Sequence, residues 1–80
     1  MTRDEILTAL GGIFREVFDD AAIEVRPDMT ADDVDGWDSL THIQLVTAVE
    51  EHFGVKFKLR EIMKFNDVGD MCDSIEKHQA

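Results

Sequence analysis

The sequence predicts an all-α fold, a four-helix bundle of three main helices and one short helix, with a long ordered loop between the first two helices. Three observations predict it. The 80 residues suffice for a single domain over residues 1–80. Apolar residues recur every three or four positions in three separate segments, as along one face of a helix. Only one short segment alternates apolar and polar residues, and no second strand is present to pair with it.

The first helix is expected over roughly residues 3–18. Thr2 and Glu5 fit a capping box, in which each side chain bonds the backbone amide of the other residue. Gly11 and Gly12 each cost a helix about 1 kcal/mol relative to alanine. The apolar stripe nevertheless continues through both glycines, which favours one helix. The stripe consists of Ile6, Leu7, Leu10, Ile13, Phe14, Val17 and Phe18.

Residues 19–38 have no helical period, and a loop of this length in a compact domain is usually functional or disordered. Pro27 and Gly36 mark turns within it. The segment also contains several large apolar residues, so we expect an ordered loop packed on the core. These residues are Ile23, Val25, Met29, Val34 and Trp37.

The second helix is expected to begin at Asp38-Ser39. The Asp38 side chain can accept hydrogen bonds from the amides of Leu40 or Thr41, and Gly54 is placed to end the helix. The apolar stripe of this helix consists of Ile43, Val46, Val49 and Phe53.

The rest of the chain predicts a connector, a short helix and a last helix. Val55, Phe57 and Leu59 alternate with lysines, which indicates an extended connector pinned by three apolar side chains. A short helix is expected at residues 60–64. Asn66 or Asp67 can cap the last helix, whose stripe consists of Val68, Met71, Cys72 and Ile75.

The charge balance excludes several classes of partner. Eighteen acidic residues against eight basic ones give a net charge of −10, which disfavours binding to nucleic acid or to an anionic membrane surface. Between Arg26 and Lys56 there is no lysine or arginine at all. Such a stretch is commonly a solvated surface, and it also suits a partner with a basic docking face. Its acids are Asp28, Asp32, Asp33, Asp35, Asp38, Glu50 and Glu51.

The sequence also predicts a cytoplasmic protein. No run approaches the roughly 18 apolar residues of a membrane span, and the first residues lack the apolar core of a secretory signal. The single cysteine, Cys72, excludes an internal disulfide and a cysteine-cluster zinc site. Its place on the last apolar stripe favours a buried small side chain.

No catalytic or metal site is expected. His42 follows Ser39 by one helical turn, but a nucleophilic serine also needs an oriented base and a pocket, so the histidines are interpreted as surface residues. Asp33 and Asp35 fit two ligand positions of a calcium loop. The first and twelfth positions hold Ala31 and His42, which excludes a dedicated calcium site but leaves incidental binding of divalent ions by clustered acids open.

Asp38-Ser39-Leu40 is the most informative motif. A serine in the first turn projects its hydroxyl near unpaired amides and the positive end of the helix dipole, where an attached phosphoryl group would be stabilised. Taken alone, the tripeptide is more typical of an ordinary capping serine. Its context resembles the phosphopantetheine-attachment region of the acyl carrier proteins. The matching residues are Gly36-Trp37-Asp38-Ser39-Leu40, Ile43, Leu45-Val46, Ala48-Val49-Glu50-Glu51, Phe53-Gly54 and Val55.

The resemblance covers the whole chain and implies a function. In such carriers a phosphopantetheinyl transferase attaches 4′-phosphopantetheine from coenzyme A to the serine that matches Ser39, which Asp38 and Leu40 flank. Acyl groups then travel as thioesters to an acyltransferase, ligase or ketosynthase with a basic docking face. The implied carrier is a monomer and not an enzyme. Candidate partner contacts are Leu40, Glu50, Glu51 and Asp35, and candidate acyl-chain lining residues are Leu45, Val46, Val49, Ile62, Met63 and Phe65.

One departure bears on the pathway. Carriers of fatty-acid synthesis usually have acids two and five residues after the modified serine, where this chain has Thr41 and Gln44. Fatty-acid, polyketide and other specialised biosynthesis therefore stay open. So do an aminoacyl or peptidyl carrier with the same arm and an unmodified acidic helical adaptor.

Overall fold

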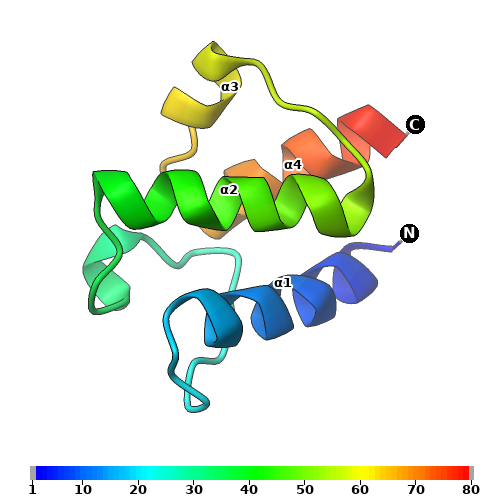
Figure 1. Cartoon of the computed structure of the whole chain (residues 1–80). Helices are drawn as coiled ribbons and strands as arrows, with labels where there is room; N and C mark the ends of the chain where they lie inside the picture. Colours follow the sequence, from blue (N-terminus) through cyan, green and yellow to red (C-terminus); the bar gives the residue numbers. More distant parts are fainter. Residues whose placement is uncertain (1, 80) are drawn as a thin grey trace.

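The computed structural model describes residues 2–79, which contain four α-helices and no strand. α1 packs against α2 and α4, and the short α3 lies beyond α2 and α4 on the opposite side from α1 (Figure 1). This arrangement confirms the predicted bundle of three main helices and one short helix. The elements in order are α1 (Arg3–Val17), the 3-10 helix η1 (Ala31–Asp33), α2 (Ser39–Phe53), α3 (Leu59–Met63) and α4 (Val68–Gln79).

The expected capping box starts α1. The Glu5 amide donates to Thr2 Oγ1 at 3.2 Å, and the Thr2 amide donates to Glu5 Oε1 at 2.9 Å. The helix runs unbroken through both glycines. Buried Gly11 leaves room for the Arg15 guanidinium, since a Cβ there would lie 3.2 Å from Arg15 Nη1. Arg15 in turn donates to the Ile23 carbonyl at 3.0 Å, which fixes the start of the loop.

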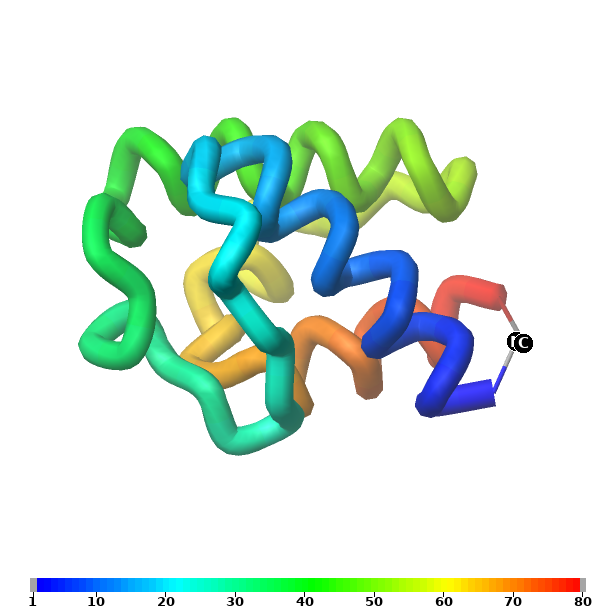
Figure 2. Tube along the Cα trace, turned by 90° about the horizontal axis from the view of Figure 1, so that it is seen from below, coloured from blue at the N-terminus to red at the C-terminus, as the bar shows by residue number. Residues whose placement is uncertain are grey.

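The start of α1 lies beside the end of α4 (Figure 2). Arg3 donates to Glu76 Oε1 at 2.6 Å and to Asp73 Oδ1 at 2.5 Å. These groups are partly exposed, so the pairs contribute modestly to stability and mainly set the register of the two helices.

The core combines the apolar stripes of the three long helices with residues of the loop. Phe14 of α1 meets Trp37 of the loop edge to face, with 5.3 Å between ring centroids. The buried apolar residues are Ile6, Leu10, Ile13, Phe14, Met29, Val34, Trp37, Leu45, Val46, Val49, Phe57, Val68, Met71, Cys72 and Ile75.

The loop between α1 and α2 is ordered, as expected, because α4 binds it. The Val68 amide donates to the Met29 carbonyl at 2.9 Å, and the Gly69 amide donates to the Pro27 carbonyl at 2.8 Å. These bonds satisfy amides that have no partner within the first turn of a helix. The loop also contains η1, which was not predicted, because three residues are too few to show a period.

The connector after α2 differs from the prediction at one of the three apolar side chains that were expected to hold it to the core. Gly54 ends α2 with a φ of 67°, in the left-handed region that favours glycine, as expected. Phe57 is buried and Val55 is half-buried, but Leu59 is 68% exposed. The expectation for Leu59 was wrong because α3 begins at this residue, where the Lys58 amide donates to Glu61 Oε1 at 3.0 Å.

The alternatives for the start of α4 are resolved in favour of Asp67, whose Oδ1 accepts the Asp70 amide at 2.8 Å. Further along α4, Cys72 is fully buried, as expected. Burial raises the pKa of its thiol to about 11.

Candidate functional site

Ser39 is the first residue of α2, and the residues before it fix where that helix begins. Gly36 turns the chain with a φ of 86°. Asp38 then caps the helix as predicted, because its Oδ1 accepts the amides of Leu40 at 3.0 Å and Thr41 at 2.9 Å. Two of the free amides at the helix start are therefore satisfied beside Ser39.

Thr41 completes this cap from within α2. Its hydroxyl accepts the Asp38 amide at 2.7 Å and donates to the Gly36 carbonyl at 2.6 Å. The bond from the Thr41 amide is the main cause that holds the pKa of Asp38 below its ordinary value, and the loss of some solvation at this exposed carboxyl opposes it. Asp38 is thus ionised at neutral pH and kept in one orientation.

The Ser39 hydroxyl itself is exposed and has no hydrogen-bond partner among residues 2–79. It lies at the positive end of the α2 dipole, where a phosphate ester is favoured. No base among these described residues contacts it, so they provide an accessible hydroxyl for modification without activating it as a nucleophile.

Ser39 opens onto a groove of about 490 Å³ between the start of α2 and α3. Apolar side chains on both helices form its rim: Ile43 of α2 is 51% exposed and Met63 of α3 is 76% exposed. Exposed apolar side chains gathered around one groove indicate a site for an apolar ligand or partner. The groove is lined by Ala31, Trp37, Asp38, Ser39, His42, Ile43, Leu59, Ile62, Met63, Phe65 and Asn66.

His42 differs from its interpretation as a surface residue. Its ring is partly buried in the groove, where Nδ1 accepts the Trp37 indole N–H at 3.0 Å and Nε2 lies 3.2 Å from the Ile62 carbonyl oxygen. Both ring nitrogens are therefore occupied, and the histidine joins the loop and α3 to α2. No local pattern in the sequence indicates this contact, because Ile62 is remote from His42 along the chain.

The candidate lining residues fall into two groups. Ile62, Met63 and Phe65 line the groove, whereas Leu45, Val46 and Val49 lie in the core and are not among its lining residues. Ile43 and Leu59 line the groove but were not proposed for it. For Ile43 a signal existed, since it belongs to the predicted apolar stripe of α2.

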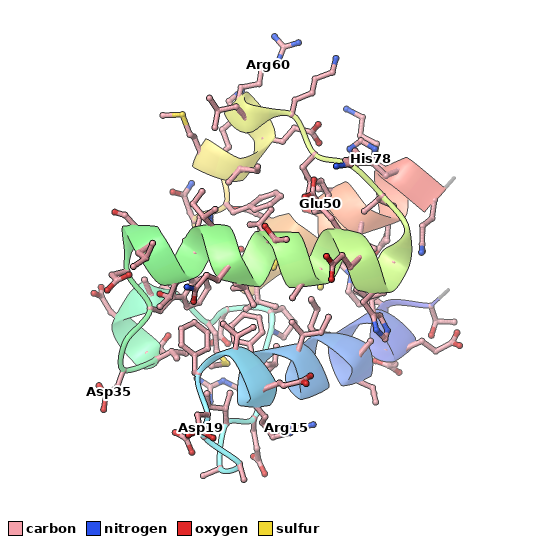
Figure 3. The ribbon with its side chains drawn as sticks, viewed as in Figure 1. Arg15, Asp19, Asp35, Glu50, Arg60 and His78 are labelled. Carbon is pink, nitrogen blue, oxygen red and sulfur yellow. The ribbon has the colours of Figure 1, made fainter. Side chains whose placement is uncertain are left out.

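The candidate partner contacts are likewise divided. Leu40 is 71% exposed beside Ser39, and Asp35 and Glu51 are exposed. Glu50 is half-buried instead, and its Oε2 accepts the Phe57 amide at 2.8 Å. Figure 3 shows Asp35 pointing away from the loop, and Glu50 far from it on the side of α2 that faces the connector.

Residues 2–79 lack two further kinds of feature. No three histidine, cysteine or acidic side chains are grouped so that they could hold a metal ion. None of the described helices is long and apolar enough to cross a membrane.

Comparison with known proteins gives the class of this chain. A family model described as "Phosphopantetheine attachment site" matches residues 8–75. The chain therefore belongs to the phosphopantetheine-bearing carrier proteins. Within that family it is similar to acyl carrier proteins: one from Acidothermus cellulolyticus is 38% identical over 76 residues, which cover 94% of this chain and 89% of that protein.

Two further relatives agree. The meromycolate extension acyl carrier protein of Mycolicibacterium smegmatis is 32% identical over 77 residues, covering 95% of this chain and 77% of that protein. The solution structure of holo acyl carrier protein from Geobacter metallireducens has a TM-score of 0.85 and 44% identity, covering 91% of this chain and 84% of the other. The chain is thus an acyl carrier protein, which carries acyl groups on covalent 4′-phosphopantetheine and is not an enzyme.

Proposed function

We propose that Ser39 is the residue to which the 4′-phosphopantetheine arm is attached, with Asp38 and Leu40 as its flanking contacts. One observation carries the proposal: the Ser39 hydroxyl is exposed, unbonded within residues 2–79, and placed at the N-terminus of α2 on the edge of an apolar groove. The site fits the group, because the helix start favours the phosphate and the groove favours an apolar chain.

Each side chain of the site has a separate role in this proposal. Asp38 orients the first turn, and Ile62, Met63 and Phe65 exclude water from the acyl chain. Leu45, Val46 and Val49 lie deeper and contact only a cargo that enters between the helices. When bound, the arm supplies the thiol that holds the acyl group as a thioester.

The proposed partners are a phosphopantetheinyl transferase and acyltransferase, ligase or ketosynthase enzymes with basic docking faces. The net charge of −10 supports them, since opposite fields speed encounter. Leu40 is the proposed apolar contact, and Asp35, Glu50 and Glu51 the acidic ones. Because Glu50 also holds the connector, its replacement should alter structure as well as docking. We propose a monomer that works in the cytoplasm.

We also propose that the chain serves a dedicated biosynthetic pathway rather than general fatty-acid synthesis. Thr41 and Gln44 support this, because they leave the face of α2 next to Ser39 without the two acids usual in general carriers. An enzyme that reads charge on this face would discriminate against the chain.

Intact mass spectrometry tests the attachment site. With coenzyme A and a broad-specificity transferase, the wild-type chain should gain one group of about 340 Da. Ser39→Ala should gain none, whereas Ser74→Ala, which alters the other serine of the chain, should be modified like the wild type. An unreactive wild type, or a modified Ser39→Ala variant, would contradict the assignment of Ser39.

A further inference from the structure

α3 is held to the rest of the molecule by few contacts. None of its residues is buried, and the closest helix packing joins α1 to α2 and α4. Two histidines reach it from the neighbouring helices: His78 of α4 contacts Glu61 at 2.9 Å, and His42 of α2 contacts the Ile62 carbonyl at 3.2 Å. Of these two, His42 is the one that lines the groove with Ser39.

The two ring nitrogens of His42 have fixed and different roles. An indole N–H can only donate, so the 3.0 Å contact from Trp37 Nε1 requires an unprotonated Nδ1. The proton of the neutral ring is therefore on Nε2, opposite a carbonyl oxygen that can only accept. The rings of Trp37 and His42 also stack, with 6.0 Å between centroids and 21° between planes.

We propose that His42, as the neutral Nε2–H tautomer, is a positioning residue that fixes α3 against the start of α2 and so sets the width of the groove beside Ser39. Its two hydrogen bonds join three segments at one point: the end of the loop, α2 and α3. The proposed function is needed only to say which ligand enters the groove, namely the arm with its acyl chain. The bridge itself belongs to the chain without its arm.

The two ends of the bridge respond differently to acid. A second proton on Nδ1 removes the acceptor for Trp37, because a doubly protonated ring has only donors, while Nε2–H still donates to Ile62. Among the described residues that line the groove, the ionisable side chain other than His42 itself is Asp38, which caps α2. The Asp38 carboxylate already accepts two amides. A doubly protonated ring would therefore lose the Trp37 bond and keep the Ile62 bond.

Three substitutions separate the two bonds. His42→Gln places an N–H donor near the position of Nε2, and His42→Asn places an oxygen acceptor near the position of Nδ1. His42→Leu removes both. His52→Leu is the matched control, since His52 is an exposed histidine of the same helix that contacts the ring of Phe53.

Amide hydrogen exchange of α3 in the full, unmodified chain is the decisive measurement. The α3 amides should exchange about tenfold faster in His42→Asn and His42→Leu than in the wild type, through local opening of the helix. They should exchange at the wild-type rate in His42→Gln and in His52→Leu. Equal protection of the α3 amides in the wild type, His42→Asn and His42→Leu would overturn the proposal. If His42→Leu does not fold, the difference in α3 exchange rate between His42→Asn and His42→Gln decides it.

Nuclear magnetic resonance supplies a readout that a merely space-filling role would not change. The ring nitrogens of His42 should show the Nε2–H tautomer, and the indole N–H signal of Trp37, the one tryptophan, should shift as His42 is protonated. That pH-dependent shift should vanish in His42→Asn and persist in His52→Leu. An Nδ1–H tautomer would contradict the proposal. Because no arm is needed, failure here is distinguishable from failure of the Ser39 assignment.

Discussion

At the scale of single residues, Thr41 shows why one of the two usual acids is absent. Its hydroxyl accepts from the Asp38 amide and donates to the Gly36 carbonyl. A carboxylate at this position could accept but could not donate, and it would lie beside the ionised Asp38. Gln44, in contrast, is exposed. Of the two positions, Gln44 therefore allows a change of charge with less structural disturbance.

Gln44→Glu should make the chain a better substrate for a general fatty-acid ketosynthase or acyltransferase. One restored charge contact at an interface rim contributes a few tenths to about 1 kcal/mol, so acyl-transfer efficiency should rise about two- to fivefold at low salt. High salt should remove most of the gain. The measurement is transfer efficiency for the wild type and the variant at both salt concentrations.

Thr8→Glu is the control for the docking experiment, because it adds the same charge to an exposed position on α1. It should leave transfer unchanged. If the wild-type chain already matches a general carrier and Gln44→Glu adds nothing, the dedicated-pathway proposal fails. General fatty-acid synthesis is then the better assignment.

At the scale of elements, the first turn of α4 and the long loop stabilise each other through backbone bonds, and Gly69 makes their close approach possible. A Cβ at this position would lie 3.1 Å from the Pro27 carbonyl oxygen and 3.2 Å from Asp67 Oδ1. Neither neighbour can move freely, since the first belongs to the backbone and the second caps α4. The glycine is thus required for packing rather than for its backbone conformation.

Gly69→Ala should therefore destabilise the chain, although alanine favours helices. We expect a loss of about 1 kcal/mol in the free energy of unfolding, measured by urea denaturation. Gly12→Ala is the matched substitution, because it lies within a helix and its added Cβ would meet no atom within 4 Å beyond its chain neighbours and the local helix backbone. It should stabilise the chain by about 0.5–1 kcal/mol. Changes of the same sign in both variants would refute the packing argument.

At the scale of the whole molecule, self-repulsion opposes folding. The net charge is −10, and no lysine or arginine lies between Arg26 and Lys56. Among the described residues, Asp28 is the one acid of that stretch that forms an ion pair, and its partner is Arg26 at 3.2 Å. Screening by dissolved ions should therefore weaken a larger number of repulsive interactions than of attractive ones.

Added salt or millimolar magnesium should consequently raise the melting temperature. A domain of this size gains about 4–8 °C for each kcal/mol of added stability, so a shift of several degrees is measurable by circular dichroism. Magnesium and sodium compared at equal ionic strength separate ion binding by the clustered acids from general screening. A melting temperature that neither salt changes would show that the repulsion costs little.

The sequence predicted the features that depend on neighbours along the chain and missed those that depend on distant ones. The caps at Thr2, Asp38 and Gly54 were predictable because each involves groups within a few residues. The bridge from His42 to Ile62 was not, because it spans two helices that only the fold brings together. The outward orientation of Leu59 was missed for a related reason, since it depends on the residue at which α3 begins.

The burial of Cys72 in α4 has a consequence for chemical selectivity. With a pKa of about 11 and no exposed surface, this thiol is almost entirely un-ionised and unreachable at neutral pH. It can neither capture an acyl group by thioester exchange nor form a mixed disulfide while the fold is intact. The thiol of the arm is therefore the single reactive sulfhydryl of the protein when the arm is attached and carries no acyl group. Alkylating or disulfide reagents will report on the arm alone, with no need to mutate the cysteine.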